Sequence, residues 1–530
     1  MIRPVAREVL LACIVPTLIA CVWMTAARGQ AASPERPFEP DEAQRARFHA
    51  LQSAGEHGLK PANYDVQALQ ALISSRDADT ASLFAERLDA AFRRYATDIS
   101  QGRLSPRADP DWHIPQHRAP VGTGASIADR TGRPPPHPDY ARLHGAMIRY
   151  LAIRERGGWS AIPAGPKLSI GMLHPQVELA RNRLRMTGDY TAMTPADPYL
   201  FDTGLDAATR IFQARHGLRR TGVIDETTRE AMNVPVGERI LQLSIAMERW
   251  RWLPRDLGHE YVWVNAADAM LELVVDGKPL LTMRTIVGHS TRPTPSLQSE
   301  IRRIVFNPAW SVPTTIATED LLPKLRRDRD FLTRNRFRIY TGAPGGATPV
   351  DPQRIDWQNV NADRFPYRFV QQPGPANSLG QIKFVFDNPY DIYIHDTPAK
   401  GLFSVRTRTF SSGCVRLEQA TGFADALLAL DRSWTGADTR RYLDDDRTQG
   451  IDLQHAVPVY IVYITSWVTA DGRAHFRRDL YRRDAPIAAA MRIDRGSFFA
   501  VNTNRRAKPA RRYTPDLNDK HRRDHHDSGQ

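Results

Sequence analysis

Residues 392–398 read IYIHDTP and residues 411–417 read SSGCVRL. The first stretch alternates in the manner of a β-strand and brings His395 to its end, before a turn. The second places Cys414 directly after a glycine, in a segment that can turn tightly. A thiol and an imidazole are the two groups that a cysteine acyl-transfer enzyme needs, because the imidazole can accept the thiol proton. The two stretches therefore predict a site that brings Cys414 and His395 together on a β-rich domain.

Cys414 is the only cysteine outside the apolar N-terminal run, which contains Cys13 and Cys21. A single thiol can form neither an intrachain disulfide nor a cysteine-rich zinc site, so Cys414 is either an inert core residue or a nucleophile. A free thiol has a pKa of about 8.5 and needs a neighbouring group to become a thiolate near neutral pH. The sequence shows no metal-ligand spacing, and we expect neither a metal nor a cofactor.

The glycine beside the cysteine predicts a second feature of the site. It lets the backbone turn so that the N–H groups of Ser412, Gly413 and Cys414 point to one place and stabilise an oxyanion, where one donor contributes about 2.7–4 kcal/mol. Tyr393, on the same strand face as His395, either lines the site or packs in the core. Arg416 either binds a substrate carboxylate or forms a structural ion pair.

Length and composition indicate a folded protein of several domains. A chain of 530 residues, of which 42% are hydrophobic, predicts two to four domains. The formal charge of +13 suits an anionic partner such as a cell-wall polymer, or simply a solvated basic surface. The interleaved basic and aromatic residues of nucleic-acid modules are lacking, so we expect no nucleic-acid partner.

Both ends of the chain differ from its body. Residues 1–32 combine Arg3 and Arg7 with a long apolar run and small residues, which predicts a signal peptide or an uncleaved signal anchor in the inner membrane. A lipoprotein cleavage box that ends at Cys21 is a third alternative. Each of these predicts an exported, periplasmic body. Residues 504–530 are basic, lack apolar periodicity and are expected to be disordered.

The body divides into three predicted domains. Residues 40–170 form a helical scaffold with a Pro-rich loop, and residues 173–235 a small three-helix unit. Residues 258–466 form a mostly β domain, because the hydrophobic period changes to two. Residues 316–371 interrupt the strand pattern with a charged, helical stretch, so we expect a helical cap that closes over the site. The expected fold class is α+β, multidomain.

The small unit has a recognisable pattern. Residues 207–218 read AATRIFQARHGL and residues 222–225 read GVID, and Thr227 or Asp225 is expected to cap a third helix. This pattern resembles the small helical peptidoglycan-binding domain. A generic three-helix module with the same glycine turns is the alternative.

The paired motifs around His395 and Cys414 resemble the catalytic signature of the L,D-transpeptidases with a YkuD-like sandwich. Residues 248–254 (ERWRWLP), 306–313 (FNPAWSVP) and 396–403 (DTPAKGLF) are similar to the YcbB-like branch of that family. The resemblance implies Cys414 as nucleophile, His395 as base, an oxyanion hole at 412–414, and Tyr393, Ser411 and Arg416 as substrate contacts. It also implies 3-3 links between diaminopimelate residues of peptidoglycan stem peptides, contact with glycan strands, and inhibition by carbapenems.

One residue departs from that signature, because Ser412 stands where the family usually has histidine. The base of the family matches His395, so catalysis should survive, while the support of the cysteine loop must come from elsewhere. Two other functions stay open at this point. One is a thiol L,D-carboxypeptidase, which passes the acyl group to water. The other is a peptidoglycan-binding scaffold with a vestigial catalytic domain.

Overall fold

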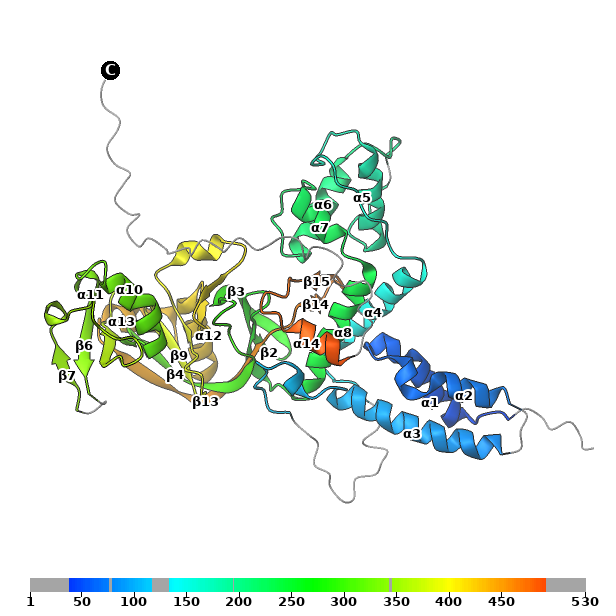
Figure 1. The fold of residues 1–530 in the computed structure, drawn as a ribbon, viewed down its shortest axis with the longest axis horizontal. Coiled ribbons are helices and arrows are strands. Elements are labelled where there is room, and N and C mark those ends of the chain that lie inside the picture. Colours follow the sequence, from blue (N-terminus) through cyan, green and yellow to red (C-terminus); the bar gives the residue numbers. More distant parts are fainter. Residues whose placement is uncertain (1–37, 76–78, 117–132, 194, 343–345, 492–530) are drawn as a thin grey trace, which may run out of the picture.

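The computed structural model describes residues 38–75, 79–116, 133–193, 195–342 and 346–491. The expected signal segment at 1–32 and the expected disordered tail at 504–530 lie outside these residues. Figure 1 shows helices α1–α3 at one end of the molecule, a β-rich body with its inserted segment at the other, and a small helical unit standing away from both. None of the helices in these ranges is long and apolar enough to cross a membrane.

The N-terminal part is helical, as expected. It comprises α1 Glu42–Gln52, α2 Val66–Ile73, α3 Thr80–Gln101 and α4 Pro138–Glu155. A capping box starts α1, because Asp41 accepts from Gln44 N at 2.7 Å and Gln44 returns the bond at 3.0 Å. Apolar residues at three- and four-residue spacing put one stripe of α3 into a core with α1 and α2.

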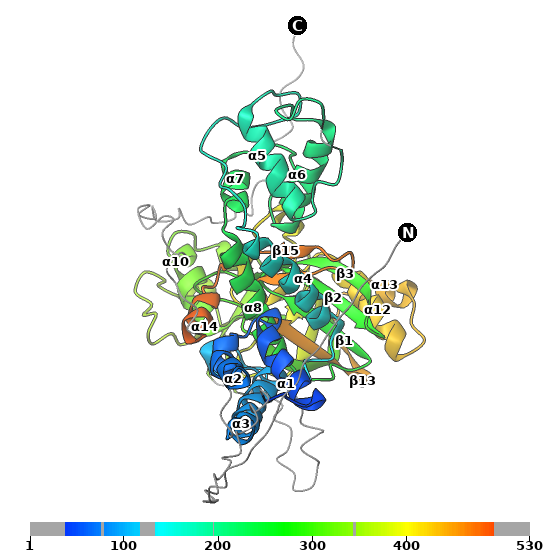
Figure 2. The same cartoon turned by 90° about the vertical axis from the view of Figure 1, so that its right-hand side faces the viewer.

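The small unit contains α5 Pro175–Met186, α6 Thr203–Arg215 and α7 Glu226–Met232 around its own apolar core. Asp225 caps α7 by accepting from Thr228 N at 2.8 Å, which selects it over Thr227. Gly222 has φ +75°, and a Cβ there would lie 2.0 Å from Asp206 Oδ1, so the turn requires glycine. Figure 2 shows this unit apart from the β-rich body.

The β-rich body is built on one nine-stranded sheet in the order β11-β3-β12-β10-β9-β4-β13-β1-β2. The sheet curls round on itself, because β2 at one end also pairs with β3 near the other. Asp276 and Gly277 make the tight turn between β2 and β3, with φ of +51° and +70°, as this residue pair favours. The strands are β1 Glu260–Asn265, β2 Met270–Val275, β3 Lys278–Gly288, β4 Leu297–Phe306, β9 Ile382–Phe386, β10 Ile394–His395, β11 Thr409–Ser411, β12 Val415–Leu417 and β13 Gln449–Val462.

The inserted segment is not the purely helical cap that the sequence predicts. It holds a four-stranded sheet of β5 Trp310–Ser311, β8 Tyr367–Gln371, β6 Phe337–Thr341 and β7 Thr348–Val350, in that order. Short helical pieces cover it: α9 Thr314–Ile316, η5 Ala317–Leu321, α10 Leu322–Leu325 and α11 Phe331–Arg334. The segment has its own core, centred on Trp357 and Phe369. The strands were missed because the dense charges of 326–338 and the irregular stretch after them mask a short alternation of buried residues.

Three further helices and a hairpin complete the body. Helix α12 Ala420–Asp431 buries Phe423 and Leu427 in the main sheet core, and α13 Gly436–Asp444 follows it. After β13 the chain forms β14 Ser466–Val468, β15 Ala474–Phe476 and α14 Asp484–Ala490. These last elements share a core with α4 and with α8 Val236–Trp252, so the C-terminal segment packs on the helical part of the chain. Trp250 and Trp252 lie in this core.

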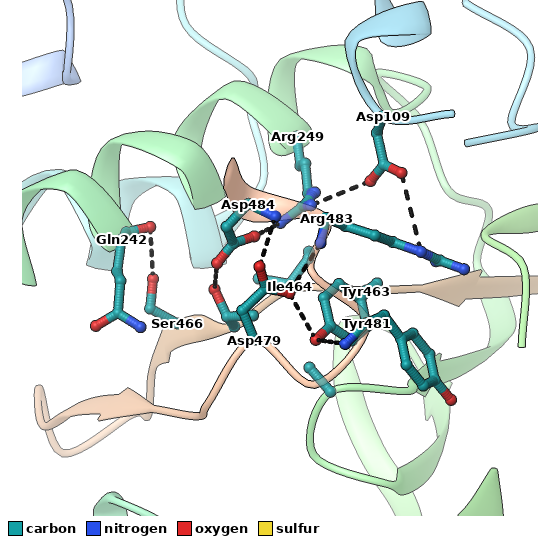
Figure 3. Close-up of polar contacts among 12 residues, drawn as sticks. Asp109, Gln242, Arg249, Tyr463, Ile464, Ser466, Asp479, Tyr481, Arg483 and Asp484 are labelled. Carbon is teal, nitrogen blue, oxygen red and sulfur yellow. Dashed lines mark hydrogen bonds and ion pairs between the residues drawn. The ribbon is translucent and has the colours of Figure 1, made fainter. Parts of the chain in front are cut away.

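A buried ionic network joins the helical part to the C-terminal segment (Figure 3). Arg249 of α8 donates to Asp484 Oδ1 at 2.5 Å and to Asp109 Oδ2 at 3.0 Å, and the side chains of Arg249 and Asp109 are completely buried. Arg483 lies between Asp109 and Asp111, 3.9 Å and 2.9 Å away. The network matters for the site because Arg483 also bonds to the loop beneath the cysteine, as described below.

Replacing Arg249 by methionine should destabilise the protein by about 3–5 kcal/mol, because two buried carboxylates lose their shared cation. Urea unfolding followed by tryptophan fluorescence would measure the change. The matched control is Arg303→Met, which breaks an exposed pair with Asp452 at 3.1 Å and should cost at most about 1 kcal/mol. Equal effects of the two substitutions would contradict a structural role for the network.

Candidate active site

The site lies on one face of three neighbouring strands, β9, β10 and β12. Ile394 of β10 pairs with Phe384 of β9 and Val415 of β12, and these three side chains point into the main core. Alternate residues of a strand point to opposite faces, so the residues next to them share the other face. Those residues are Lys383 on β9, His395 on β10 with Tyr393 directly before it, and Arg416 on β12 with Cys414 directly before the strand.

The turn before Cys414 requires a glycine. Gly413 has φ +117°, and a Cβ at this position would lie 2.8 Å from Ile392 Cδ1. Ser411, which is buried, closes the turn: its hydroxyl donates to Cys414 O at 2.5 Å and accepts from Gly413 N at 3.2 Å. Ser411 therefore organises the turn with its hydroxyl, and its expected contact with a substrate stays a prediction.

The same bonds leave fewer N–H donors for the predicted oxyanion hole. The Gly413 N–H is already engaged by Ser411 Oγ. The amides of Ser412 and Cys414 have no acceptor outside the strand ladders of the described chain. Two of the three predicted donors are thus available in this conformation, and Gly413 contributes its backbone angle instead.

Hydrogen bonds from the loop between β3 and β4 hold the turn before Cys414 in place. Thr294 Oγ1 donates to Gly413 O at 2.7 Å and accepts from Gly288 N at 2.8 Å, and His289 N donates to Ser411 O at 2.9 Å. Arg483 of the buried network donates to Thr294 O at 3.0 Å. The cysteine turn is therefore held by a continuous chain of hydrogen bonds that reaches the ionic network of Figure 3.

The thiol of Cys414 is partly exposed, and donates to the main-chain carbonyl of Asp391 over 3.7 Å. Burial raises the pKa of Cys414, while the backbone of Tyr393 and the charges of Arg416 and Lys383 oppose this shift. The Tyr393 hydroxyl lies within hydrogen-bonding reach of the thiol, and burial together with the charge of Cys414 raises the pKa of Tyr393 above its usual range. Tyr393 thus lies beside the thiol and also packs against the core of the inserted segment.

His395 is buried, with 4% of its surface exposed. Burial and the charge of Arg416 lower the pKa of His395 to about 3, against opposing backbone bonds to Asp396 and Leu379. Its Nδ1 atom has no hydrogen-bond partner among the described residues, so a neutral ring keeps an acceptor atom free. The ring meets Tyr393 edge-on at 5.7 Å between centroids.

The structure refines the predicted pairing of His395 with Cys414. The two residues share a strand face, but His395 stands in register with Arg416, and no hydrogen bond joins its ring to the thiol within the described chain. Tyr393 is the residue beside Cys414, as its carbonyl accepts from Val415 N at 3.1 Å. The raised pKa of Cys414 and the lowered pKa of His395 both favour the neutral forms of the two groups over an ion pair.

Two basic residues at the site were not predicted from the sequence. Lys383 lies on the strand next to His395 and places its ammonium group 3.9 Å from the centre of the Tyr393 ring. In the sequence, Lys383 can be recognised as a lysine on the polar face of the alternating segment 382–386. Arg292 comes from the loop between β3 and β4, far from Cys414 in sequence, and no local pattern marks it.

Arg292 connects the cysteine turn to the inserted segment. It donates to Ser412 Oγ at 2.9 Å and to Asp320 at 2.7 and 3.1 Å, and it also pairs with Glu319. Asp320 and Glu319 belong to the π-helical piece η5, a type of helix that often marks functional sites. Ser412 is the position that departs from the family signature, and here its side chain is held by Arg292.

Replacing Arg292 by alanine should slow acylation of Cys414 by about tenfold to a hundredfold, because a misplaced reacting group is costly even at a shift of 1 Å. The melting temperature should change little, since Asp320 and Glu319 are about half exposed. Time-resolved intact-mass spectrometry with an acylating β-lactam would measure the rate. The control is Arg334→Ala, which breaks only an exposed pair with Asp328 inside the inserted segment. Equal acylation rates in both variants would contradict a positioning role.

A cysteine on a glycine turn, with free amides beside it and a buried neutral histidine on the next strand, is the arrangement of a cysteine acyltransferase. Comparison with known families gives the more specific class. The model of the L,D-transpeptidase catalytic domain matches residues 259–459, the scaffold domain model residues 36–147, and the model of a candidate peptidoglycan binding domain residues 174–232. The chain thus matches the models of an L,D-transpeptidase catalytic domain, a scaffold domain and a peptidoglycan-binding domain, in an order that runs from the scaffold domain to the catalytic domain.

Individual relatives agree with this assignment. A candidate L,D-transpeptidase of Haemophilus influenzae is 34% identical over 249 residues, which are 47% of this chain and 49% of the relative. The chain therefore spans about half the length of that curated relative.

Solved structures show similarity at low identity. An L,D-transpeptidase from Stackebrandtia nassauensis has 12% identity over 57% of this chain and 95% of its own, with a TM-score of 0.21. L,D-transpeptidase 3 from Mycobacterium tuberculosis, in complex with a faropenem-derived adduct, has 11% identity over 38% and 60%, with a TM-score of 0.19. Superpositions this poor carry no detail over to the present site.

Proposed function

We propose that this protein is an L,D-transpeptidase that cross-links peptidoglycan stem peptides through a thioester on Cys414. The observation that carries the proposal is the shared strand face of Cys414 and His395, in a domain that matches the L,D-transpeptidase catalytic model. The amides of Ser412 and Cys414 have no acceptor among the described residues, and Nδ1 of His395 has no hydrogen-bond partner there. The match of residues 174–232 to a peptidoglycan binding domain supports the choice of substrate.

In the first step, Cys414 Sγ attacks the carbonyl carbon of the third residue of a donor tetrapeptide. The thiol proton moves to the free Nδ1 atom of His395, and the oxyanion is stabilised by the amides of Ser412 and Cys414. The bond to the terminal D-alanine then breaks, and its amine leaves with the proton from His395. A thioester on Cys414 remains.

In the second step, the side-chain amine of diaminopimelate on another stem attacks the thioester. His395 takes the proton of this amine and returns a proton to the departing sulfur, which regenerates the thiol and leaves a 3-3 link. Water as the acceptor would give a tripeptide instead. Tyr393 and Arg416, on the same face as Cys414, contact the donor peptide in this proposal.

The remaining parts of the chain suit a cell-wall enzyme. The peptidoglycan-binding domain would hold glycan strands close to the catalytic domain. Residues 1–32 would direct the protein to the periplasm or anchor it in the inner membrane. A carbapenem would acylate Cys414, because its strained carbonyl takes the place of the scissile carbonyl near the amides of the cysteine turn.

Incubation of the purified exported body with defined tetrapeptide muropeptides tests the proposal. Mass spectrometry should find cross-linked dimers that have lost one D-alanine. Tripeptide without dimer would identify an L,D-carboxypeptidase instead. Binding to peptidoglycan without any product would identify a scaffold with a vestigial catalytic domain.

A further inference from the structure

Two cations flank the base of this site in a single row across three strands. His395 on β10 is directly opposite Lys383 on β9 and directly opposite Arg416 on β12. Residues paired in this way point to the same face of the sheet, on neighbouring strands about 4.7–4.9 Å apart. Lys383, His395 and Arg416 therefore form a short basic row, and Cys414 lies two residues before Arg416 on that face.

This basic row has no anionic side chain of its own. Among the described residues, neither Lys383 nor Arg416 forms an ion pair, and Arg416 Nε is buried without a hydrogen-bond partner. The nearest carboxylate in sequence, Asp396, is occupied by Lys400 at 2.6 Å and by Gln381 N at 3.0 Å. The Cys414 thiol, when ionised, and the exposed carboxylate of Asp391 act on Lys383 through their fields, and the Cys414 thiol acts on Arg416 in the same way, but neither forms an ion pair with these cations.

Partly buried cations without counter-charges are unfavourable unless an anion binds to them. Histidine in the middle of the row stays neutral and does not add a third charge. A step of two residues along a strand covers about 6.6 Å, so an anion at Arg416 would lie a few ångströms from a carbonyl carbon attacked by Cys414 Sγ. A carboxylate one residue beyond the scissile bond meets that requirement.

We propose that Lys383 and Arg416 together bind the terminal carboxylate of the donor peptide, on the residue that leaves. This proposal rests on the proposed function and specifies its donor: the site selects a peptide with a free C-terminal carboxylate one residue beyond the attacked bond. Lys383 is then a substrate-binding residue of the site. The carboxylate also places the scissile carbonyl beside the thiol, because its position is determined by two cations from different strands.

A comparison of two donors tests the proposal directly. One donor is a tetrapeptide with a free C-terminal carboxylate, and the other is the same peptide with a C-terminal amide. The wild-type protein should have a kcat/KM about tenfold to a hundredfold higher for the carboxylate donor, as expected for a lost hydrogen bond to a charged group. Lys383→Met should lose about tenfold on the carboxylate donor and less than twofold on the amide donor, and Arg416→Met should behave in the same way.

The controls separate binding from other roles of Lys383. Lys278→Met, at the exposed start of β3, should leave both kcat/KM values unchanged. Lys383→Arg should keep the preference for the carboxylate, and it decides the matter if Lys383→Met does not fold. Equal losses on both donors would mean that Lys383 acts on the thiol or on the fold, which overturns the proposal. Equal use of both donors by the wild type would also overturn it, whereas no turnover of either donor would overturn the transpeptidase function itself.

Discussion

Cys414→Ala should reduce turnover of tetrapeptide donors by about 10⁶-fold, to the background of the assay, because loss of a covalent nucleophile has an effect of this order. The fold should remain, since the side chain is partly exposed at the edge of the main core and alanine fits its place. Liquid chromatography of the products measures the loss. Intact-mass spectrometry should show a carbapenem adduct on the wild type and none on the variant.

The thermal stability of the Cys414→Ala variant is the control for its loss of activity. Thermal unfolding within a few degrees of the wild type would show that the lost activity is chemical and not structural. An adduct on the alanine variant, or measurable cross-linking by it, would exclude Cys414 as the nucleophile.

His395→Gln should lower kcat/KM by about 10²–10⁴-fold, because the thiol loses the group that accepts its proton. Glutamine is close in size and keeps a polar end in the buried position, so a folding defect is less of a concern than with alanine. Stopped-flow acylation by a β-lactam separates this step from later ones. A loss below threefold would show that another group, such as Tyr393, takes the proton.

The pH dependence gives a second, independent check on His395. Its pKa is lowered to about 3, so the imidazole remains neutral and able to accept a proton from pH 7 down to about pH 4. Activity of the wild type should therefore lack an acid limb near pH 6.5, the usual pKa of histidine. Alkylation of Cys414 should rise with pH through a midpoint above that of a free thiol, because burial raises its pKa. A thiol midpoint below pH 7 would indicate an ion pair with His395.

The lowered pKa of His395 also makes the stability of the folded protein depend on pH. A histidine whose pKa is lowered on folding binds fewer protons in the folded state than in the unfolded state between about pH 3 and pH 6.5. Its contribution to stability is therefore present above pH 6.5 and is lost as the pH falls through this range. His57, whose pKa burial also lowers to about 3, adds to the same trend from the helical part of the chain.

Much of the fold was predictable where it depends on local patterns. The helices of residues 42–101, the turn at Asp276 and Gly277, and the cap at Asp225 follow from periodicity and from the conformations that these residues favour. The inserted segment was harder, because its strands are three to five residues long and lie between charged stretches. A short strand in such a setting is stabilised by its pairing with other strands, which the sequence does not reveal.

The chemical identity of the site was determined by the sequence alone: a single cysteine after a glycine, and a histidine at the end of a strand. Their surroundings were decided by the tertiary structure. Lys383 and Arg416 meet His395 only through the pairing of β9 and β12 with β10, and Arg292 reaches Ser412 from a loop more than a hundred residues earlier. The side-chain alternation of a strand is local, whereas its register with other strands depends on the packing of the whole sheet. For that reason Ser411 proved to organise the cysteine turn, Gly413 proved to be engaged, and the cations of the site could be recognised only in the folded protein.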